Sequence, residues 1–254
     1  MSASSNEVAW GSDFTGIYDS VVWGATNLVS GDTWGGGIGF ASVNEGSFAS
    51  TIDEPNGILA ITTDTADNDN AVLIGGRCRP SLGPAWLEAR FKYSNLDTSV
   101  FVGFSETMAL DTPVMPAEFA TVTMTYNGTG GMVGLQYDVD GTTDDFRALM
   151  GDGGAGVATS STTGFRANAT VTADKWLIAR VELSPDGSGA CYLADTGHVD
   201  GNSRPIMRLI KRFTAGLTAS DLFYPVLMVE NRSGNARVLE VDYFKGAGTR
   251  SWAA

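Results

Sequence analysis

The sequence is poor in the residues from which most active sites are built. It has one histidine, His198, and two cysteines, Cys78 and Cys191, among 254 residues. One histidine excludes a multi-histidine metal site and makes any serine or cysteine triad depend on His198 as its base. No Gly-x-Ser-x-Gly elbow is present, and both cysteines lie in apolar contexts. We expect an exposed hairpin histidine, free buried thiols with a disulfide as the open alternative, and no enzymatic activity.

Basic residues are also scarce, because 16 Lys and Arg stand against 29 Asp and Glu, for a net charge of −13. An acidic surface repels nucleic-acid phosphates and anionic membranes. No apolar run approaches the ~20 residues that a membrane helix needs. The first residues, Met1–Glu7, lack the basic and apolar regions of a secretory signal. We therefore expect no nucleic-acid or membrane partner, and synthesis in a cytoplasm.

Helical periodicity is nearly absent, whereas alternation with period two is common. The segment Asp111–Phe119 contains two prolines and is predicted to be a loop or a single turn. In Ala85–Tyr93 every second residue is apolar, and Lys175–Leu183 repeats the pattern with Val181 on the apolar side and Glu182 on the other. Such segments are typical of strands that bury one face.

Further strands follow from the same test. They are Gly57–Thr63, Ala71–Arg77, Val100–Ser105, Thr121–Tyr126, Met132–Tyr137, Phe146–Met150, Ala190–Ala194, Phe223–Glu230 and Arg237–Phe244. Four links rich in Gly, Asn and Asp are predicted to close antiparallel hairpins: Asn127-Gly128, Asp140-Gly141, Pro185–Gly187 and Ser233–Asn235. The 32 glycines fit many turns, and Asp152–Gly156 is predicted to be the most mobile loop. We predict an all-β, two-sheet antiparallel sandwich over residues 31–254, preceded by a strap or docking arm over residues 1–30.

The order of several segments resembles a known family. Asp13-Phe14 comes first, then Gly57–Thr63, then the strands that begin at Trp86 and Phe101. Asp174–Glu182 and the closing Leu239–Phe244 stand late in the chain. This order is similar to the concanavalin-A-like (laminin-G-like) jelly rolls, and most like those in structural proteins of tailed bacteriophages. The resemblance spans roughly Asp13 to Trp252, and its motifs reflect sheet packing.

Laminarinase-type glycoside hydrolases share this fold and carry a Glu-x-Asp-x-x-Glu strand. The match here is Glu240–Lys245, in which Lys245 replaces the final glutamate. Retaining hydrolysis needs carboxyl groups about 5–5.5 Å apart, whereas a two-residue step spans about 6.6–6.8 Å along a strand. We therefore expect Glu240 and Asp242 to be solvated carboxylates on an outward face.

No cofactor is expected, although two acidic loops are candidates for calcium. Asp138–Asp145 carries four carboxylates, and Asp64, Asp67 and Asp69 form the second loop. Calcium takes six to eight oxygen ligands, but the spacing is not that of an EF-hand. Because Asp and Asn favour turns anyway, solvated turns are the favoured interpretation and calcium the alternative.

Six tryptophans suggest where a partner would bind. Trp86 and Trp176 lie on the faces opposite Leu87 and Leu177, where they either pack under a loop or form a platform for a sugar ring. The region before Asp32 has few strand signals but several aromatics. The candidate docking residues are Trp10, Phe14, Tyr18, Trp23 and Trp252.

Two functional hypotheses from different classes remain. The first is a non-enzymatic virion structural protein of a tailed bacteriophage, such as a capsid decoration or head-surface subunit. It would be assembled in the host cytoplasm, displayed on the virion surface, and bound to a major capsid protein and to its own copies as a homo-oligomer. The second is a carbohydrate-binding, lectin-like module or adhesin, which needs an exposed aromatic with nearby amides or carboxylates to hold a glycan.

Overall fold

The computed structural model describes residues 7–12, 33–34, 38–42, 46–51, 57–108, 113–120, 123–128, 130–141, 143–152, 155–156, 165–169, 171–214 and 216–249. These residues form β-strands and connecting loops, with a short 3₁₀ turn at Pro80–Leu82. Within them, no helix is long and apolar enough to cross a membrane.

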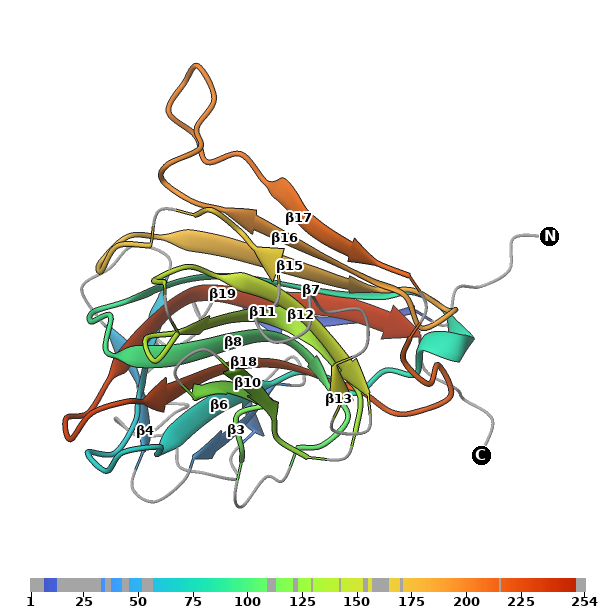
Figure 1. The fold of residues 1–254 in the computed structure, drawn as a ribbon, viewed down its shortest axis with the longest axis horizontal. Helices are drawn as coiled ribbons and strands as arrows, with labels where there is room; N and C mark the ends of the chain where they lie inside the picture. The colour runs from blue at the N-terminus through green and yellow to red at the C-terminus, as the bar shows by residue number, and fades with distance from the viewer. Residues whose placement is uncertain are drawn as a thin grey trace.

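The first sheet has β7 and β19 at its centre, and all its printed pairings are antiparallel (Figure 1). Its order is β17 (Arg208–Phe213), β16 (Gly189–Ala194), β15 (Leu177–Leu183), β7 (Ala85–Tyr93), β19 (Val238–Thr249), β5 (Ile58–Thr62) and β4 (Ser47–Thr51). Strand β1 (Glu7–Ser12) pairs with the second half of β19, beyond the part that pairs with β5.

The second sheet is also antiparallel and lies against the first. Its order is β13 (Ala155–Gly156), β12 (Arg147–Asp152), β11 (Met132–Asp138), β8 (Thr98–Ser105), β18 (Tyr224–Asn231), β6 (Asn70–Ile74), β3 (Ile38–Ser42) and β2 (Thr33–Trp34), with β14 (Phe165–Arg166) beside β12. A separate hairpin consists of β9 (Ala117–Ala120) and β10 (Thr123–Tyr126).

Alternation explains the core between the sheets. In β7 and β15, buried and half-buried residues alternate without interruption, so Val181 is fully buried and Glu182 is not. The inward side chains of both sheets form one cluster that runs from Phe48 to Phe244. The predicted register of both strands is therefore confirmed, and so is the two-sheet sandwich.

The second sheet is buried on both faces, which alternation alone did not predict. Strands β8 and β11 are buried at every position. The β9–β10 hairpin covers their outer face with a second cluster rich in methionine: Met108, Met115, Met124, Met132 and Met228. Methionine is unbranched and flexible, so it fills an irregular gap between a hairpin and a sheet.

One glycine pair shows how the second cluster is packed. Gly103 of β8 and Gly134 of β11 lie directly opposite each other. A Cβ on Gly134 would lie 2.6 Å from the ring of Phe101, and a Cβ on Gly103 would lie 2.2 Å from the carbonyl oxygen of Val133. The paired glycines therefore let an aromatic ring lie flat across the sheet.

Several sequence predictions need correction. Ser233–Asn235 does not close a hairpin, because it connects β18 of the second sheet to β19 of the first. Asn127-Gly128 leads from β10 into β11, and these strands do not pair with each other. The segment Asp111–Phe119, predicted as a loop, ends in β9. Turn residues mark where a chain reverses, but they do not determine which strand it then pairs with.

Strand β1 was missed as well. It lies in the region predicted as a strap or docking arm, where strand signals are few, yet it runs antiparallel along β19 from Glu7↔Thr249 to Ser12↔Phe244. An edge strand pairs through its backbone, so its side chains need not alternate. The other two predicted hairpins, at Asp140-Gly141 and Pro185–Gly187, do join paired neighbours.

Candidate functional site

The carboxylates that the hydrolase comparison singled out lie on the outer face of the first sheet. Glu240 Oε2 is 2.7 Å from Lys92 Nζ, and Asp242 Oδ2 is 2.5 Å from Arg90 Nη1. A register shift between Val241 and Tyr243 places Asp242 at a bulge. Both carboxylates are thus half-buried and ion-paired rather than solvated, because neighbouring strands present basic residues opposite them.

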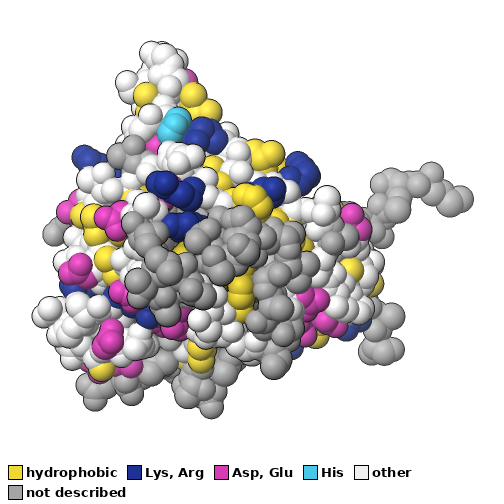
Figure 2. Space-filling view, viewed as in Figure 1, with side chains coloured by type: hydrophobic (Ala, Val, Ile, Leu, Met, Phe, Trp, Pro, Cys, Tyr) yellow, Lys and Arg dark blue, Asp and Glu magenta, His cyan; other side chains and the backbone are white. Residues whose placement is uncertain are grey.

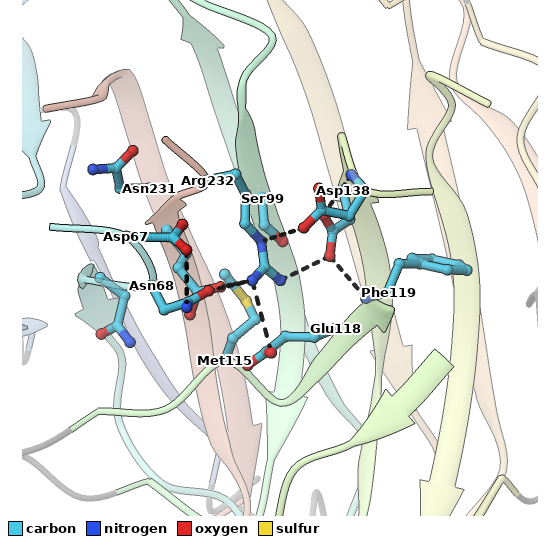
Figure 3. Close-up of polar contacts among 12 residues, drawn as sticks. Asp67, Asn68, Ser99, Met115, Glu118, Phe119, Asp138, Asn231 and Arg232 are labelled. Atoms are coloured by element: carbon cyan, nitrogen blue, oxygen red, sulfur yellow. Dashed lines mark hydrogen bonds and ion pairs between the residues drawn. The ribbon is translucent and has the colours of Figure 1, made fainter. Parts of the chain in front are cut away.

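The acidic end of the second sheet is arranged around Arg232, whose side chain is 5 % exposed (Figure 3). Its guanidinium lies 2.9 Å from Asp138 Oδ2 and 3.1 Å from Glu230 Oε1. Glu118 Oε2 follows at 3.7 Å and Asp140 Oδ2 at 3.8 Å. Four carboxylates from β9, β11, β18 and the turn after β11 therefore share one fixed cation.

The same cluster fastens the β9–β10 hairpin to the sheet. Asp138 Oδ2 accepts the backbone N–H of Phe119 at 2.9 Å, and its Oδ1 accepts the N–H of Asp140 at 3.1 Å. Arg232 Nη1 donates to Asn68 Oδ1 at 2.6 Å. The cluster thus brings together members of the two predicted acidic loops and the hairpin (Figure 3).

Two other acidic residues of these loops, Asp145 and Asp64, have partners outside this cluster. Asp145 accepts the N–H groups of Asn168 and Ala169 at 2.9 and 3.0 Å, and Arg166 Nε lies 3.2 Å from it. Asp64 caps the N–H of Thr65 at 2.6 Å. Among the described residues no group of three or more acidic, His or Cys side chains forms a site for a metal ion. The solvated-turn prediction is wrong for Asp69, Asp138 and Asp145, which are buried. Arginines and backbone donors pair with Asp138 and Asp145 and offset the cost of burying them.

Burial also changes the protonation of this cluster. It raises the pKa of Glu230 to about 8, since Arg232 is shared with other carboxylates and offsets only part of the cost of burial. Glu230 Oε1 contacts Arg232 as an ion pair but not in line with an N–H group. Burial likewise raises the pKa of Asp138, although Arg232 and two backbone donors oppose the shift.

His198 lies on the loop between β16 and β17. Its Nδ1 is 3.0 Å from Asp195 Oδ1, and Arg208 Nη2 is 2.8 Å from Asp195 Oδ2. Burial would raise the pKa of Asp195, but its hydrogen bonds to His198 and Arg208 outweigh burial and lower it. The ring is partly exposed, as predicted, but it is bound to a buried carboxylate.

Both thiols are free and buried. Burial raises the pKa of Cys78 to about 12 and raises that of Cys191 as well. Cys191 Sγ donates to the carbonyl oxygen of Gly134 at 3.3 Å. The prediction of free, buried thiols is confirmed, and neither thiol has the lowered pKa of a nucleophile.

Trp86 of β7 and Trp176, which directly precedes β15, are each covered by a cation. The guanidinium of Arg180 lies 4.7 Å from the ring centroid of Trp86, and that of Arg90 lies 4.3 Å from Trp176. Both rings are half-buried on the outer face of the first sheet. They stack on arginine side chains, which leaves no bare platform of the kind that one alternative required.

The proposed docking residues remain untested. Trp10 belongs to β1, opposite Gly246, but the described structure does not extend to its side chain. The other four, Phe14, Tyr18, Trp23 and Trp252, lie outside the described residues.

A pocket of about 380 Å³ opens at one end of the second sheet. It is lined by Arg77, Arg79, Glu106, Ser220, Asp221, Leu222 and Tyr224. An isolated bridge pairs Cys78 with Phe223, with N···O distances of 3.0 and 2.9 Å. Both bridge residues point into the core. By alternation, the residues that flank them on the two segments turn outward to the same side and line the pocket.

The pocket combines apolar surface with polar side chains, one of which, Glu106, accepts the backbone N–H of Gly131 at 2.7 Å. The guanidinium of Arg77 lies 5.5 Å from the ring centroid of Tyr224, and Leu222 is exposed beside it. Arg79 Nε is buried without a hydrogen-bond partner. Among the described residues no carboxylate lies within ion-pair distance of Arg77 or Arg79. Two cations, two carboxylates and two hydroxyl-bearing side chains therefore line the pocket together with Leu222.

Sequence reasoning missed both the pocket and Arg232. Arg77-Cys78-Arg79 shows alternation, but nothing in the chain indicates that residues 220–224 lie opposite it. Arg232 directly precedes Ser233–Asn235, a segment predicted as a hairpin turn, where an arginine is expected to be exposed. No sequence signal indicated Arg232, because the carboxylates around it were expected to be solvated and so to need no cation.

Comparisons with known proteins show which solved structures have a similar fold. No family model matches the sequence, and no curated protein matches it. A protein of unknown function from Shewanella oneidensis MR-1 is 15 % identical, with 99 % of this chain and 91 % of that chain covered at a TM-score of 0.50. Peanut lectin, solved with a nonapeptide, is 12 % identical over 87 % of this chain and 95 % of its own, at a TM-score of 0.51. The exoplasmic/lumenal domain of VIP36, in its Ca²⁺/Man3GlcNAc-bound form, is 9 % identical over 90 % of each chain, at 0.51.

At these identities the likenesses concern the fold alone. The chain has the concanavalin-A-like lectin fold, an all-β sandwich of two antiparallel sheets. This confirms the family resemblance that the order of its strands indicated, as far as the fold is concerned.

Proposed function

We propose that the protein is a non-enzymatic, lectin-like module that binds a glycan in the pocket between Arg77 and Tyr224. The observation that carries the proposal is the mixed lining of this pocket, where the apolar surface of Leu222 lies beside two arginines that have no ion pair among the described residues. The lectin fold of the chain supports the same proposal.

A sugar ring presents apolar C–H faces and a rim of hydroxyls, each of which both donates and accepts. Leu222, which is exposed, supplies apolar surface for the ring, and the hydroxyl of Tyr224 is a further polar group of the lining. The guanidinium groups of Arg77 and Arg79 donate to hydroxyl oxygens, and Asp221 accepts from hydroxyl protons. The volume lies within the range of about 300–1,000 Å³ that small-molecule pockets occupy.

The proposal is tested by a glycan array followed by titration calorimetry with the best glycan. We expect the wild-type protein to retain at least one glycan. Arg77→Ala and Asp221→Asn should each weaken binding about tenfold or more, which corresponds to about 1.4 kcal/mol for each lost polar contact. Thermal melts should show that both variants fold, because neither side chain belongs to the core.

Lys175→Ala is the matched control, since Lys175 is exposed and distant in sequence from the pocket. Its affinity should equal that of the wild type. An array without any retained glycan would overturn the proposal. Undiminished binding by both pocket variants would move the site elsewhere.

The absence of enzymatic activity is part of the proposal. The nearest carboxylate pair, Glu240 and Asp242, is engaged with Lys92 and Arg90. Lys245 replaces the third acidic residue, and its Nζ lies 3.2 Å from Glu88 Oε1. The burial of Cys78 and Cys191 supports the same conclusion.

The virion hypothesis stays a prediction from the sequence. None of the three similar structures is described as a virion protein. Assembly with a major capsid protein, a homo-oligomeric state and a place on a virion surface likewise rest on the family resemblance. Glycan binding has a candidate site in the described structure, so it is the function we put forward.

A further inference from the structure

Strand β17 forms one edge of the first sheet, and the loop before it projects from the molecule (Figure 1). Among the described strands, β17 pairs with β16 alone. The projecting loop is an ordered hairpin, because Val199 and Pro205 form a bridge and the N–H of Ile206 donates to the carbonyl of His198 at 2.9 Å. This edge therefore presents a row of unpaired backbone groups beside a fixed projection.

The edge and the loop expose apolar side chains. Val199 and Ile206 are each 44 % exposed, and Leu209 is 50 % exposed. They are three of the six large apolar residues that are exposed in the described part of the chain. Three of these six residues thus lie within eleven positions of the chain. Such clustering is typical of an interaction surface, whereas single exposed apolar residues are usually scattered.

The same segment is basic in an acidic protein. Residues 204–213 contain Arg204, Arg208, Lys211 and Arg212 and no acidic residue, although the chain as a whole carries −13. Figure 2 shows Lys and Arg side chains gathered over the β15–β17 half of this face, whereas Asp and Glu lie mostly over the other half.

Not all of these charges are available to a partner. Arg208 is paired with Asp195 at 2.8 Å, and Lys211 Nζ lies 3.8 Å from the ring centroid of Phe165. Arg212 reaches only the hydroxyl of Tyr192 at 3.4 Å, and Arg204 is exposed with no ion pair among the described residues. Arg204 and Arg212 are therefore the two cations left open along this edge.

Basic residues on an edge strand also have a protective role, since like charges keep two such edges apart. Pairing β17 with β17 of a second copy would bring these cations together, which is destabilising. The same charges attract a strand that carries acidic residues. The basic residues of this edge therefore disfavour a second copy of β17 and favour an acidic strand.

We infer that the β17 edge binds an extended acidic segment of a partner protein, which adds to the first sheet as a further strand. The partner's backbone pairs with β17, and its carboxylates face Arg204 and Arg212. Its apolar side chains cover Leu209 and the projecting residues Val199 and Ile206. This surface is separate from the glycan pocket.

The test uses the full chain and a labelled peptide about ten residues long, the upper length of an ordinary strand, with alternating Val and Glu. Fluorescence anisotropy should show binding that weakens as salt rises from about 0.05 to 0.3 M, because screening shortens the reach of surface charges. Arg204→Glu combined with Arg212→Glu should reduce affinity at least about tenfold. Hydrogen exchange of residues 208–213 should slow on binding, which distinguishes strand addition from attraction of charge alone.

Lys175→Glu is the matched control, since it makes the same change from a basic to an acidic residue beside the same sheet, and it should bind as the wild type does. A peptide with Lys in place of Glu should not bind. Failure of the wild type to bind the acidic peptide would overturn the inference, as would unchanged affinity in the double variant. A wild-type homodimer that forms through β17 in sedimentation would overturn it as well, because a second copy would then be the occupant.

Discussion

Arg232 determines how the acidic end of the second sheet is arranged. A buried carboxylate is costly unless a cation or several donors pair with it. Four carboxylates share this guanidinium, so its single charge cannot compensate all of them. The least compensated of them is Glu230, whose pKa is raised to about 8 by burial.

This raised pKa predicts how the stability of Glu230→Gln relative to wild type changes with pH. At about pH 4 Glu230 is protonated in the folded state and largely so in the unfolded state, so wild type and variant should have similar stability. As pH rises toward 8, the unfolded chain releases this proton while the folded chain keeps it, and the free energy of unfolding falls. At about pH 9 the variant should be more stable by at least 1 kcal/mol, which raises Tm by about 2–4 °C for a domain of this size.

Thermal melts of both proteins across this pH range measure the effect. Glu182→Gln, which makes the same substitution on the outer face of the first sheet, is melted alongside as the control. If Glu230→Gln instead loses stability at high pH, an ionised Glu230 stabilises the fold through Arg232 and the prediction is wrong.

Strand β19 pairs with three other strands of the first sheet. It pairs with β7 along one side and with β5 and then β1 along the other. The register shift at Asp242 lies where its pairing passes from β5 to β1. A bulge bends a strand and increases its twist, so this feature suits a strand that must follow two successive partners.

Removal of the first 29 residues tests what β1 contributes. The truncation deletes the ladder from Glu7 to Ser12 and leaves the edge of β19 open from Phe244 to Thr249. We expect the truncated protein to fold but to melt at a lower temperature, by at least about 2–4 °C, since about 1 kcal/mol has this effect at this size.

Trp10→Ala is the companion variant, because it keeps the backbone ladder. Under the docking hypothesis it should lower the binding of a partner and leave Tm nearly unchanged. An unaltered Tm after truncation would show that β1 adds nothing to the fold, and would leave the whole segment to a partner.

The whole molecule should unfold as one unit. Its inter-sheet cluster joins residues from Phe48 to Phe244, and the chain crosses between the sheets from β18 to β19 near its end. We expect the transitions followed by tryptophan fluorescence and by far-ultraviolet circular dichroism to coincide in urea. Limited proteolysis should trim the N-terminal residues and cut near Asp152–Gly156. Two stable fragments of comparable size would contradict a single domain.

The sequence by itself determined the class of the fold and the register of its best strands. Alternation in Ala85–Tyr93 placed each side chain correctly, because successive residues of a strand face opposite sides whatever the partner strand is. The apolar surroundings of the cysteines correctly predicted free, buried thiols. These are local properties that a chain carries before it folds.

Only the tertiary structure decided which segments meet. Arg232 is 94 residues from Asp138, and Arg77 is 147 residues from Tyr224, yet each pair defines a site. The turn residues of Ser233–Asn235 predict a hairpin because they indicate a reversal of the chain but not which strand follows it. Strand β1 is not predicted from the sequence because a strand can pair through its backbone without an alternating pattern of side chains. Long-range pairing depends on how both sheets pack at once, and no local pattern in the sequence encodes that choice.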